Sequence, residues 1–315
     1  DPIVRVWEAV GLQLSESDVE SEDPTMLIVD GKPVVGYRDW GSEAVLQIWD
    51  GDAWSVTVPD PTGGNVVAFY EGPSFCTKGS TIYMAYSHAG DSGAGDDAFY
   101  DRVFVMQWTA ADGWSWMNNG DEISVISATP PGANAWEPSI SIAAGQPWTA
   151  WVEDVIGDSF DEEQVWIAET TATASTRSLP LDRNDEAGSY STVARCVGVY
   201  VAPSGIKYLA HWESDANDQD RTDLFVSSYT GGSFTNIGGI VATDYDSNNL
   251  SVPSMAVFNN ELWVAFTVAN DIDYTKHVYV KRYSGGVWTT VGGGPLTAFG
   301  RSEEHTSELQ SRITI

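Results

Sequence analysis

Residues 137–151 read EPSISIAAGQPWTAW, and this stretch decides the fold. Apolar and polar residues alternate on both sides of a turn at residues 144–146, which predicts two antiparallel strands joined by a tight hairpin. The same pattern recurs at residues 23–37, 72–86, 197–211 and 252–266. In every copy the second strand ends in a small residue followed by a ring: Gly36-Tyr37, Ala85-Tyr86, Ala150-Trp151, Ala210-His211 and Ala265-Phe266.

A third and a fourth strand are expected after each hairpin. The third strands are predicted at residues 45–49, 103–108, 165–170, 224–229 and 278–283, and the fourth at residues 53–58, 114–118, 176–181, 233–237 and 287–291. Four antiparallel strands per repeat are typical of a propeller blade, and blades must stack because none can bury both faces alone. We therefore expect an all-β propeller as one domain over residues 1–300, with blades near 23–58, 72–118, 137–182, 194–239 and 252–293.

Both ends of the sequence bear on the size of the ring. Residues 4–11 resemble the fourth strand at 286–292, but no first three strands precede them. This orphan strand predicts a native ring of six or more blades, with one blade missing after the fifth. Residues 301–315 begin where that blade would start, and they resemble the translation of a common sequencing adapter. We therefore expect them to be a non-native tail.

The charge balance limits the possible partners. The chain has 45 Asp and Glu against 15 Lys and Arg, a net charge of −30. Such a surface repels phosphate backbones and anionic membranes and attracts cations or basic protein surfaces, although it can also simply stay hydrated. No apolar run reaches the roughly 18 residues of a membrane helix, so membrane insertion is not expected. Cys76 and Cys196 lie in different repeats and are expected to be isolated thiols, with a single bridge as the alternative.

Most of the acids fall in the loops that cover one face of the predicted propeller. The loops between second and third strands are predicted to hold Asp39, Glu43, Asp91, Asp96, Asp97, Asp101, Glu153, Asp154, Asp158, Asp161, Glu162, Glu163, Glu213, Asp215, Asp218, Asp220, Asp223, Asp271 and Asp273. The loops between blades add Glu16, Asp18, Glu20, Glu22, Asp23, Asp60, Glu71, Asp121, Glu122, Glu137, Asp185, Glu186, Asp244 and Asp246. The opposite face receives few acids, chiefly Asp30, Asp50, Asp52, Asp112 and Glu261. We therefore expect one strongly acidic face.

Two clusters on that face are candidate metal sites, because hard carboxylate and amide oxygens suit Ca²⁺. The candidate ligands are Asp154, Asp158, Asp161 and Glu162 in one loop, and Asp215, Asn217, Asp218, Asp220 and Asp223 in another. The second cluster lacks the glycine and the bidentate glutamate of an EF-hand loop. A solvated acidic face without bound ions is the alternative.

Catalytic motifs are not found in the sequence. There is no G-x-S-x-G, H-E-x-x-H, phosphate-binding or paired-cysteine motif, and His211 occupies a packing position. No catalytic residue and no cofactor-binding residue is therefore predicted. A carboxylate pair for glycoside hydrolysis could lie among so many acids, but spacing alone does not select it.

The repeat resembles a type common in exported bacterial and archaeal propeller proteins. The resemblance rests on PSMAV at 253–257, LWVAF at 262–266 and VYVKRYSGGVWTTVGG at 278–293, and it covers about residues 4–296. It implies secretion or surface display, and usually binding rather than catalysis. The motifs of sialidases, WD repeats and integrin-like calcium repeats are absent.

Three functions remain open on the sequence. The leading interpretation is a non-catalytic, extracellular or cell-surface propeller that binds a protein, a glycan or cations through its acidic face. The second is a carbohydrate-active enzyme, a glycoside hydrolase or lyase, with carboxylates at the channel mouth. The third is a self-assembling structural subunit of a surface layer or filament.

Overall fold

Five antiparallel sheets of four strands each make up the protein. The computed structural model describes residues 14, 21–39, 43–57, 72–91, 99–124, 134–155, 162–177, 194–215, 218–244, 250–269 and 276–296. In each sheet the strands lie side by side in chain order, so each sheet is one blade of the predicted propeller. The prediction of an all-β propeller with four-stranded blades is confirmed. Residues 4–11 and 301–315 lie outside the described residues.

Each blade contributes one strand to each of four concentric positions. The innermost strands are β1 (Ser21–Val29), β5 (Ser74–Lys78), β9 (Ala135–Ala143), β13 (Ala194–Val201) and β17 (Ser254–Phe258). The second strands are β2 (Lys32–Asp39), β6 (Thr81–Asp91), β10 (Gln146–Val155), β14 (Lys207–Asp215) and β18 (Glu261–Ala269). The third strands are β3 (Glu43–Trp49), β7 (Phe99–Thr109), β11 (Glu162–Thr170), β15 (Asp218–Thr230) and β19 (Lys276–Ser284). The outer strands are β4 (Trp54–Thr57), β8 (Gly113–Trp116), β12 (Ser175–Arg177), β16 (Ser233–Asp244) and β20 (Val287–Thr290), with short 3-10 turns at Asn118–Gly120 and Val291–Gly293.

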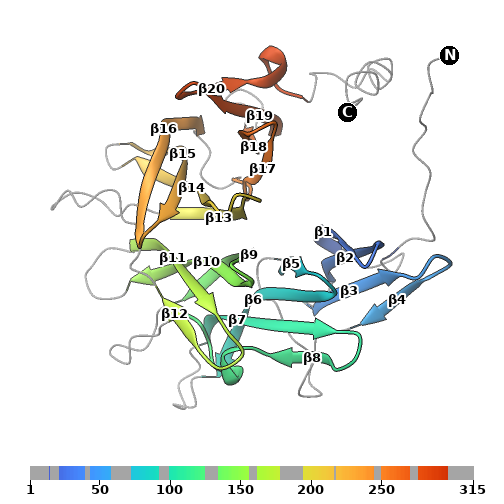
Figure 1. Cartoon of the computed structure of the whole chain (residues 1–315). Coiled ribbons are helices and arrows are strands. Elements are labelled where there is room, and N and C mark those ends of the chain that lie inside the picture. The colour runs from blue at the N-terminus through green and yellow to red at the C-terminus, as the bar shows by residue number, and fades with distance from the viewer. Residues whose placement is uncertain are drawn as a thin grey trace, which may run out of the picture.

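The innermost strands surround a common centre (Figure 1). Strand β1 contacts β5, β5 contacts β9, β9 contacts β13, and β13 contacts β17. The blades therefore follow one another in chain order around the centre, and blades 1 and 5 form the two ends of the arc.

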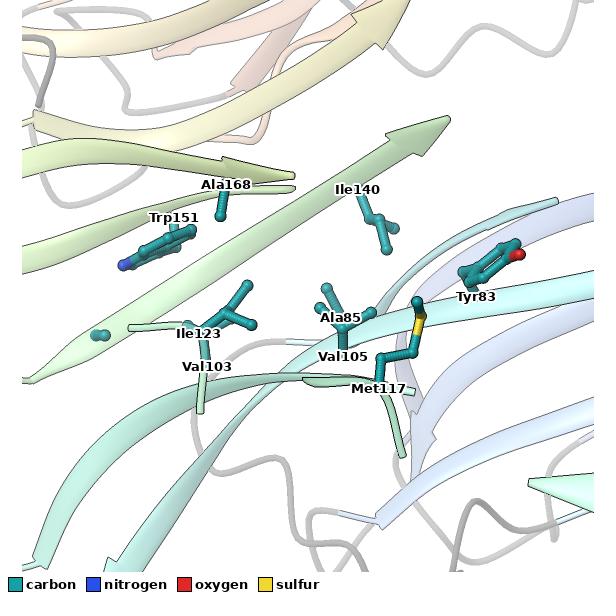
Figure 2. Packing of buried hydrophobic residues seen from close by; sticks show 10 residues of the cluster. Tyr83, Ala85, Val103, Val105, Met117, Ile123, Ile140, Trp151 and Ala168 are labelled. Atoms are coloured by element: carbon teal, nitrogen blue, oxygen red, sulfur yellow. The ribbon is translucent and has the colours of Figure 1, made fainter. Parts of the chain in front are cut away.

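The described core is divided among the interfaces between blades. Four buried apolar clusters lie between blades 1 and 2, 2 and 3, 3 and 4, and 4 and 5. Figure 2 shows the second of them, in which Trp151 of blade 3 and Ile140 of β9 face side chains of blade 2. Trp151 is fully buried. Burial of each large apolar side chain contributes roughly 2 kcal/mol, so stacking stabilises every blade.

Hydroxyl groups tie the innermost strands to one another. The Ser74 hydroxyl accepts a hydrogen bond from the Ile140 amide at 3.2 Å. The hydroxyls of Ser139 and Ser141 accept from the amides of Val199 and Val201 at 3.0 and 3.2 Å. These amides lie at strand edges and would otherwise lack a partner in the protein. The contacts fix the register of each blade against the next.

The hairpin turns between first and second strands lie where the sequence predicts them. In blade 3 the turn residues Ala144 and Gly145 have φ angles of +49° and +86°. In blade 5 the equivalent residues Asn259 and Asn260 have φ angles of +51° and +61°. Asparagine tolerates the left-handed region, whereas alanine pays a steric cost there.

We expect Ala144→Asn to stabilise the protein by about 0.5–1 kcal/mol, because asparagine is preferred at this position of a two-residue hairpin loop. Ala144 is exposed, so the new side chain meets no packed neighbour. Urea unfolding measures the change, and Asn259→Ala is the matched control, with an expected loss of similar size. An unchanged midpoint for both variants would contradict this account.

The outer strand of blade 4 is longer than the sequence predicts. It was expected at residues 233–237, but β16 continues to Asp244 past two irregularities in its pairing with β15. Gly238 and Gly239 supply the positive φ angles of +72° and +76° that the irregularity requires. The extension makes Asp244 a fully buried strand residue rather than a loop residue.

Two further sequence predictions can be compared with the described residues. Cys76 is a free thiol, and burial raises its pKa above the ordinary value. No helix within the described ranges is long and apolar enough to cross a membrane.

Candidate functional site

Three innermost strands carry the same irregularity at one end of the propeller. In β9, Glu137 and Pro138 together oppose the single residue Trp151, because Trp136 pairs with Val152 and Ser139 with Ala150. Two residues opposing one is the pattern of a β-bulge, which bends the strand and re-aims a side chain. The same two-against-one pairing occurs at residues 23–24 of β1 and 196–197 of β13.

Glu137 has the least favourable backbone among the bulge residues of the described blades. Its φ angle is +53°, in the left-handed region that non-glycine residues avoid. The next residue is Pro138, which favours an extended conformation of the residue before it. Such a backbone costs of the order of 1–3 kcal/mol and persists only where the surrounding structure enforces it. The half-buried Glu137 side chain is thus held in place at a measurable cost in stability.

A second acid holds the equivalent position two blades away. Asp23 stands before Pro24 and opposite Tyr37, as Glu137 stands before Pro138 and opposite Trp151. In blade 2 the corresponding residue is Gly72, which has no side chain. Blades 1 and 3 therefore each place one carboxylic acid at the same end of an innermost strand, on either side of a position without a side chain.

A buried ion pair lies directly beside Glu137 in blade 3. Glu153 pairs in register with Ala135, at the start of the strand that carries Glu137. Its carboxylate accepts hydrogen bonds from the indole of Trp151 at 2.8 Å and from the guanidinium of Arg177 at 3.1 Å. The Arg177 guanidinium also lies 3.4 Å from the centre of the Trp166 ring. Burial lowers the pKa of Arg177, and the neighbouring Glu153 opposes that shift.

Blade 4 repeats this arrangement with different residues. His211 and Glu213 occupy the places of Trp151 and Glu153, and the His211 Nε2 atom lies 3.3 Å from the Glu213 carboxylate. Glu213 stands opposite Asp223 in the next strand, and both are buried. Asp223 accepts three hydrogen bonds from Arg221, at 2.9, 3.2 and 3.3 Å, and one from the Thr243 hydroxyl at 2.5 Å.

Blades 1 and 2 carry smaller polar groups at the same level. The hydroxyl of Tyr37 and the amide nitrogen of Gln47 both donate to the Leu14 carbonyl, at 3.1 and 2.6 Å. Burial raises the pKa of Tyr37. Burial also raises the pKa of Asp101, which is moderated by the nearby His88. Polar side chains thus lie at this end of every blade from 1 to 4.

The acids at this end fall into two chemical classes. Glu153 and Asp223 each form an ion pair with an arginine. Arg177 links β12 to Glu153 in β10, whereas Asp223 is linked to the next strand, β16, by the Thr243 hydroxyl. Asp23 and Glu137 stand instead on bulges of the innermost strands. The residues of the second class therefore stand on the strands nearest the centre of the propeller.

Three of the nine predicted metal ligands lie outside the described residues, namely Asp158, Asp161 and Asn217. The backbone of Asp154 lies in β10, that of Glu162 in β11, that of Asp215 in β14, and that of Asp218 and Asp220 in β15. The sequence placed these acids in loops, but the strands extend further than their apolar alternation indicates. Asp223, also expected in a loop, is a buried strand residue bound to Arg221. Within the described ranges no group of three or more acids, histidines or cysteines could hold a metal ion.

Asp23 and Glu137 were not among the predicted site residues. Both were assigned to loops between blades, whereas both lie in strands. A signal was nevertheless present, because an acid followed by proline and a hydroxyl residue opens the first and third repeats, as Asp23-Pro24-Thr25 and Glu137-Pro138-Ser139. The other repeats replace the acid by glycine, cysteine or valine.

Comparison with known proteins relates this fold to solved structures only. No family model and no curated protein sequence matches the chain. A thermostable family-43 glycoside hydrolase is similar in fold, with 12% identity, a TM-score of 0.52 and coverage of 92% of this chain and 98% of that one. An exo-1,5-alpha-L-arabinanase from a bovine ruminal metagenomic library matches with 13% identity, a TM-score of 0.51 and coverage of 85% and 95%. A protein of unknown function from Dyadobacter fermentans matches with 11% identity, a TM-score of 0.55 and coverage of 88% and 94%.

These similarities correct the leading interpretation of the sequence. A non-catalytic binding propeller was expected, but of these three solved structures both that have a stated activity are glycoside hydrolases. The interpretation was wrong because it took the absence of a recognised motif as a sign of binding, although a carboxylate pair for hydrolysis needs no contiguous motif. The chain has the five-bladed propeller fold that these hydrolases share.

Proposed function

We propose that this protein is a glycoside hydrolase whose catalytic carboxylates are Asp23 and Glu137. The observation that supports the proposal is the backbone of Glu137, a residue with a φ of +53° immediately before a proline, on a bulge of an innermost strand. Strained backbones of this kind cluster at active sites, where the strained geometry serves the function although it lowers the stability of the fold. Asp23 supplies the second acid from the equivalent bulge of blade 1.

The chemistry needs two carboxyl groups on either side of one glycosidic bond. One donates a proton to the leaving oxygen, and the other activates water or attacks the sugar directly. Acids on alternate blades suit this division, because the residue at the equivalent position of the intervening blade is Gly72, which has no side chain. The surrounding acidic face makes it easier for one of the two groups to keep its proton, since like charges disfavour ionisation.

Substrates for the test follow from the similar structures. One of them is named as an exo-1,5-alpha-L-arabinanase, so arabino-oligosaccharides belong at the head of a panel that also includes galactans, xylans and uronate-containing glycans. We expect the purified protein to release reducing sugar from at least one member. Heat-inactivated protein and the double variant Asp23→Asn/Glu137→Gln are the controls. Turnover that persists in the double variant would overturn the assignment of the acids.

Calcium binding at the acidic face is a further part of the proposal. If Asp154, Asp158 and Asp161 bind Ca²⁺, millimolar Ca²⁺ should raise the melting temperature and a chelator should reverse the rise, because a ligand of the folded state stabilises it. The variant Asp154→Asn/Asp158→Asn should lose the response. Asp112→Asn on the opposite face should keep it. An equal response in both variants would show that only general charge screening is involved.

The other expectations from the sequence stay predictions. They are secretion or surface display, a protein or glycan partner at the acidic face, self-assembly, and a native ring of six or more blades. The resemblance to exported propeller repeats also stays a prediction.

A further inference from the structure

The backbone of Glu137 persists only if its surroundings enforce it. A φ angle of +53° is costly for a glutamate, and Pro138 after it favours an extended conformation instead. Such a strained conformation survives where neighbouring contacts over-determine it. Strand β10 is paired with this part of β9, and its residue opposite the bulge is Trp151. The contacts of Trp151 are therefore the first place where an enforcing structure can lie.

The Trp151 ring packs on the side of blade 3 that faces blade 2. It is fully buried in one cluster with Ala135 and Ile140, the residues of β9 that flank the bulge on either side. Figure 2 shows Trp151 and Ile140 in this cluster. Residues paired across an antiparallel ladder share a face of the sheet, so the ring lies on the same face as these flanking residues. The ring is thus part of the packed surface against this stretch of β9.

A hydrogen bond fixes the orientation of this ring. The indole nitrogen of Trp151 donates to the Glu153 carboxylate at 2.8 Å, and Glu153 is 5% exposed. Glu153 stands opposite Ala135, the first residue of β9. The anchor of the ring therefore lies beside the strand position two residues before Glu137.

The outer strand holds the Glu153 carboxylate in turn. Arg177 of β12 donates to it at 3.1 Å, and the Arg177 guanidinium lies 3.4 Å from the centre of the Trp166 ring. Trp166 stands in β11, directly opposite Trp151. Arg177, Trp166, Glu153 and Trp151 thus form one row across the blade, which we call the brace. It runs from the outer strand to the strand that pairs with the Glu137 bulge.

The rings opposite the other two described bulges have polar anchors as well. The Gln47 amide nitrogen donates to the Tyr37 hydroxyl at 2.7 Å, opposite the bulge of β1. His211, opposite the bulge of β13, has its Nε2 atom 3.3 Å from the Glu213 carboxylate. In blades 2 and 5 the rings of this column stack on a ring of the third strand: Tyr86 on Phe104 and Phe266 on Tyr279. A polar anchor on the opposing ring therefore accompanies each of the three described bulges.

We propose that Glu153 is a positioning residue for Glu137. It fixes the Trp151 ring, and the fixed ring holds the bulge in the backbone conformation that orients the Glu137 carboxyl group. Glu153 acts through Trp151 rather than on the substrate, because one of its oxygens is bound to the indole and the other to Arg177. The expected effect on turnover rests on the proposed hydrolase function, whereas the effect on the backbone of Glu137 does not.

Two fully buried tryptophans of β10 give a matched pair of variants. Trp151→Phe keeps a ring, as Phe266 shows for this column in blade 5, but removes the donor to Glu153. Trp148→Phe removes the same atoms from a ring that packs toward blade 4, where its indole nitrogen has no hydrogen-bond partner in the described part of the chain. Both variants should lose stability to a similar extent.

Only Trp151→Phe should lower kcat on the glycan that the panel identifies. We expect a fall of about 10²-fold per folded molecule with KM unchanged, because a small misplacement of a reacting group has effects of that size. Trp148→Phe should keep the kcat of the unsubstituted protein. Full turnover in Trp151→Phe, or an equal loss in both variants, would overturn the proposal.

Rescue by a conservative variant separates the hydrogen bond from the charge. Glu153→Leu and Glu153→Gln both remove the negative charge, but only glutamine keeps an oxygen that accepts from the indole. Turnover should therefore be lost in Glu153→Leu and largely kept in Glu153→Gln. The same loss in both would contradict a role through Trp151. These two variants also decide the question if Trp151→Phe does not fold.

A measurement without substrate keeps this proposal apart from the hydrolase function. The Cα and Cβ chemical shifts of Glu137 report its φ angle, so they should move toward extended-strand values in Trp151→Phe and in Glu153→Leu. They should stay in place in Trp148→Phe. Unmoved shifts in all three variants would overturn the brace, whatever the activity. If the unsubstituted protein turns over no glycan while the shifts move as expected, the hydrolase function fails and the brace stands.

Discussion

Glu137→Gln is expected to lower kcat on the hydrolysed glycan by about 10³-fold, because a positioned carboxyl that transfers a proton contributes roughly 10²–10⁴-fold to such reactions. Glutamine keeps the size and the hydrogen-bonding atoms of the side chain, so the fold and the binding of substrate should be retained. Steady-state kinetics on the substrate identified from the panel measures the change. Glu261→Gln, on the opposite face, is the matched control and should leave kcat unchanged.

A companion variant separates the chemistry of Glu137 from its backbone. Glu137→Gly removes the carboxylate and also relieves the φ of +53°, so turnover should be lost while the free energy of unfolding rises by about 1 kcal/mol. A residue that serves only the fold would behave differently, with stability falling when it is removed. Undiminished turnover in Glu137→Gln would exclude Glu137 from the reaction.

Arg177→Met is expected to destabilise the protein by about 3 kcal/mol, because it leaves the buried Glu153 carboxylate without its cation. The side chains of Arg177 and Glu153 are only 15% and 6% exposed, so solvent cannot replace the guanidinium. The substitution also removes the guanidinium from the face of Trp166. Chemical denaturation measures the loss.

A double-mutant cycle distinguishes the ion pair from simple packing. Glu153→Gln in the Arg177→Met background removes the uncompensated charge and should recover most of the stability, since replacing both partners costs far less than removing one. Arg282→Met is the matched control, because its partner Glu261 is 27% exposed and the loss there should stay below about 1 kcal/mol. Additive effects of Arg177 and Glu153 would show that they do not interact.

The fold could be predicted from the sequence because its signals repeat. Strands of alternating polarity, a small residue before an aromatic ring or imidazole, and turn residues such as glycine or asparagine recur in five copies. A strand that is assigned wrongly in one repeat can therefore be recognised by comparison with the other four. Strand ends were harder to predict, because polar residues continue the strands beyond the apolar alternation. Asp154, Asp215 and Asp244 read as loop residues, yet all three lie in strands.

The candidate site could be predicted only in part. The sequence predicted an acidic face, but the acids on it were chosen as candidate ligands by how many lie close together in the sequence rather than by their backbone conformation. A bulge is visible only when the pairing of two strands is known, and a positive φ at Glu137 has no signature in composition. The arginine partners of Glu153 and Asp223 were also missed. Arg177 lies in β12, two strands away from Glu153 in β10, and Arg221 lies two residues before Asp223, which was already counted as a metal ligand.

The shared clusters between blades have a consequence for how such a chain can change in length. Because each apolar cluster belongs half to one blade and half to the next, inserting or deleting one whole repeat adds or removes one complete cluster. The number of repeats can therefore change by duplication or deletion of whole repeats, with a complete cluster gained or lost at each step. A cut inside a repeat instead separates strands that are paired within one sheet.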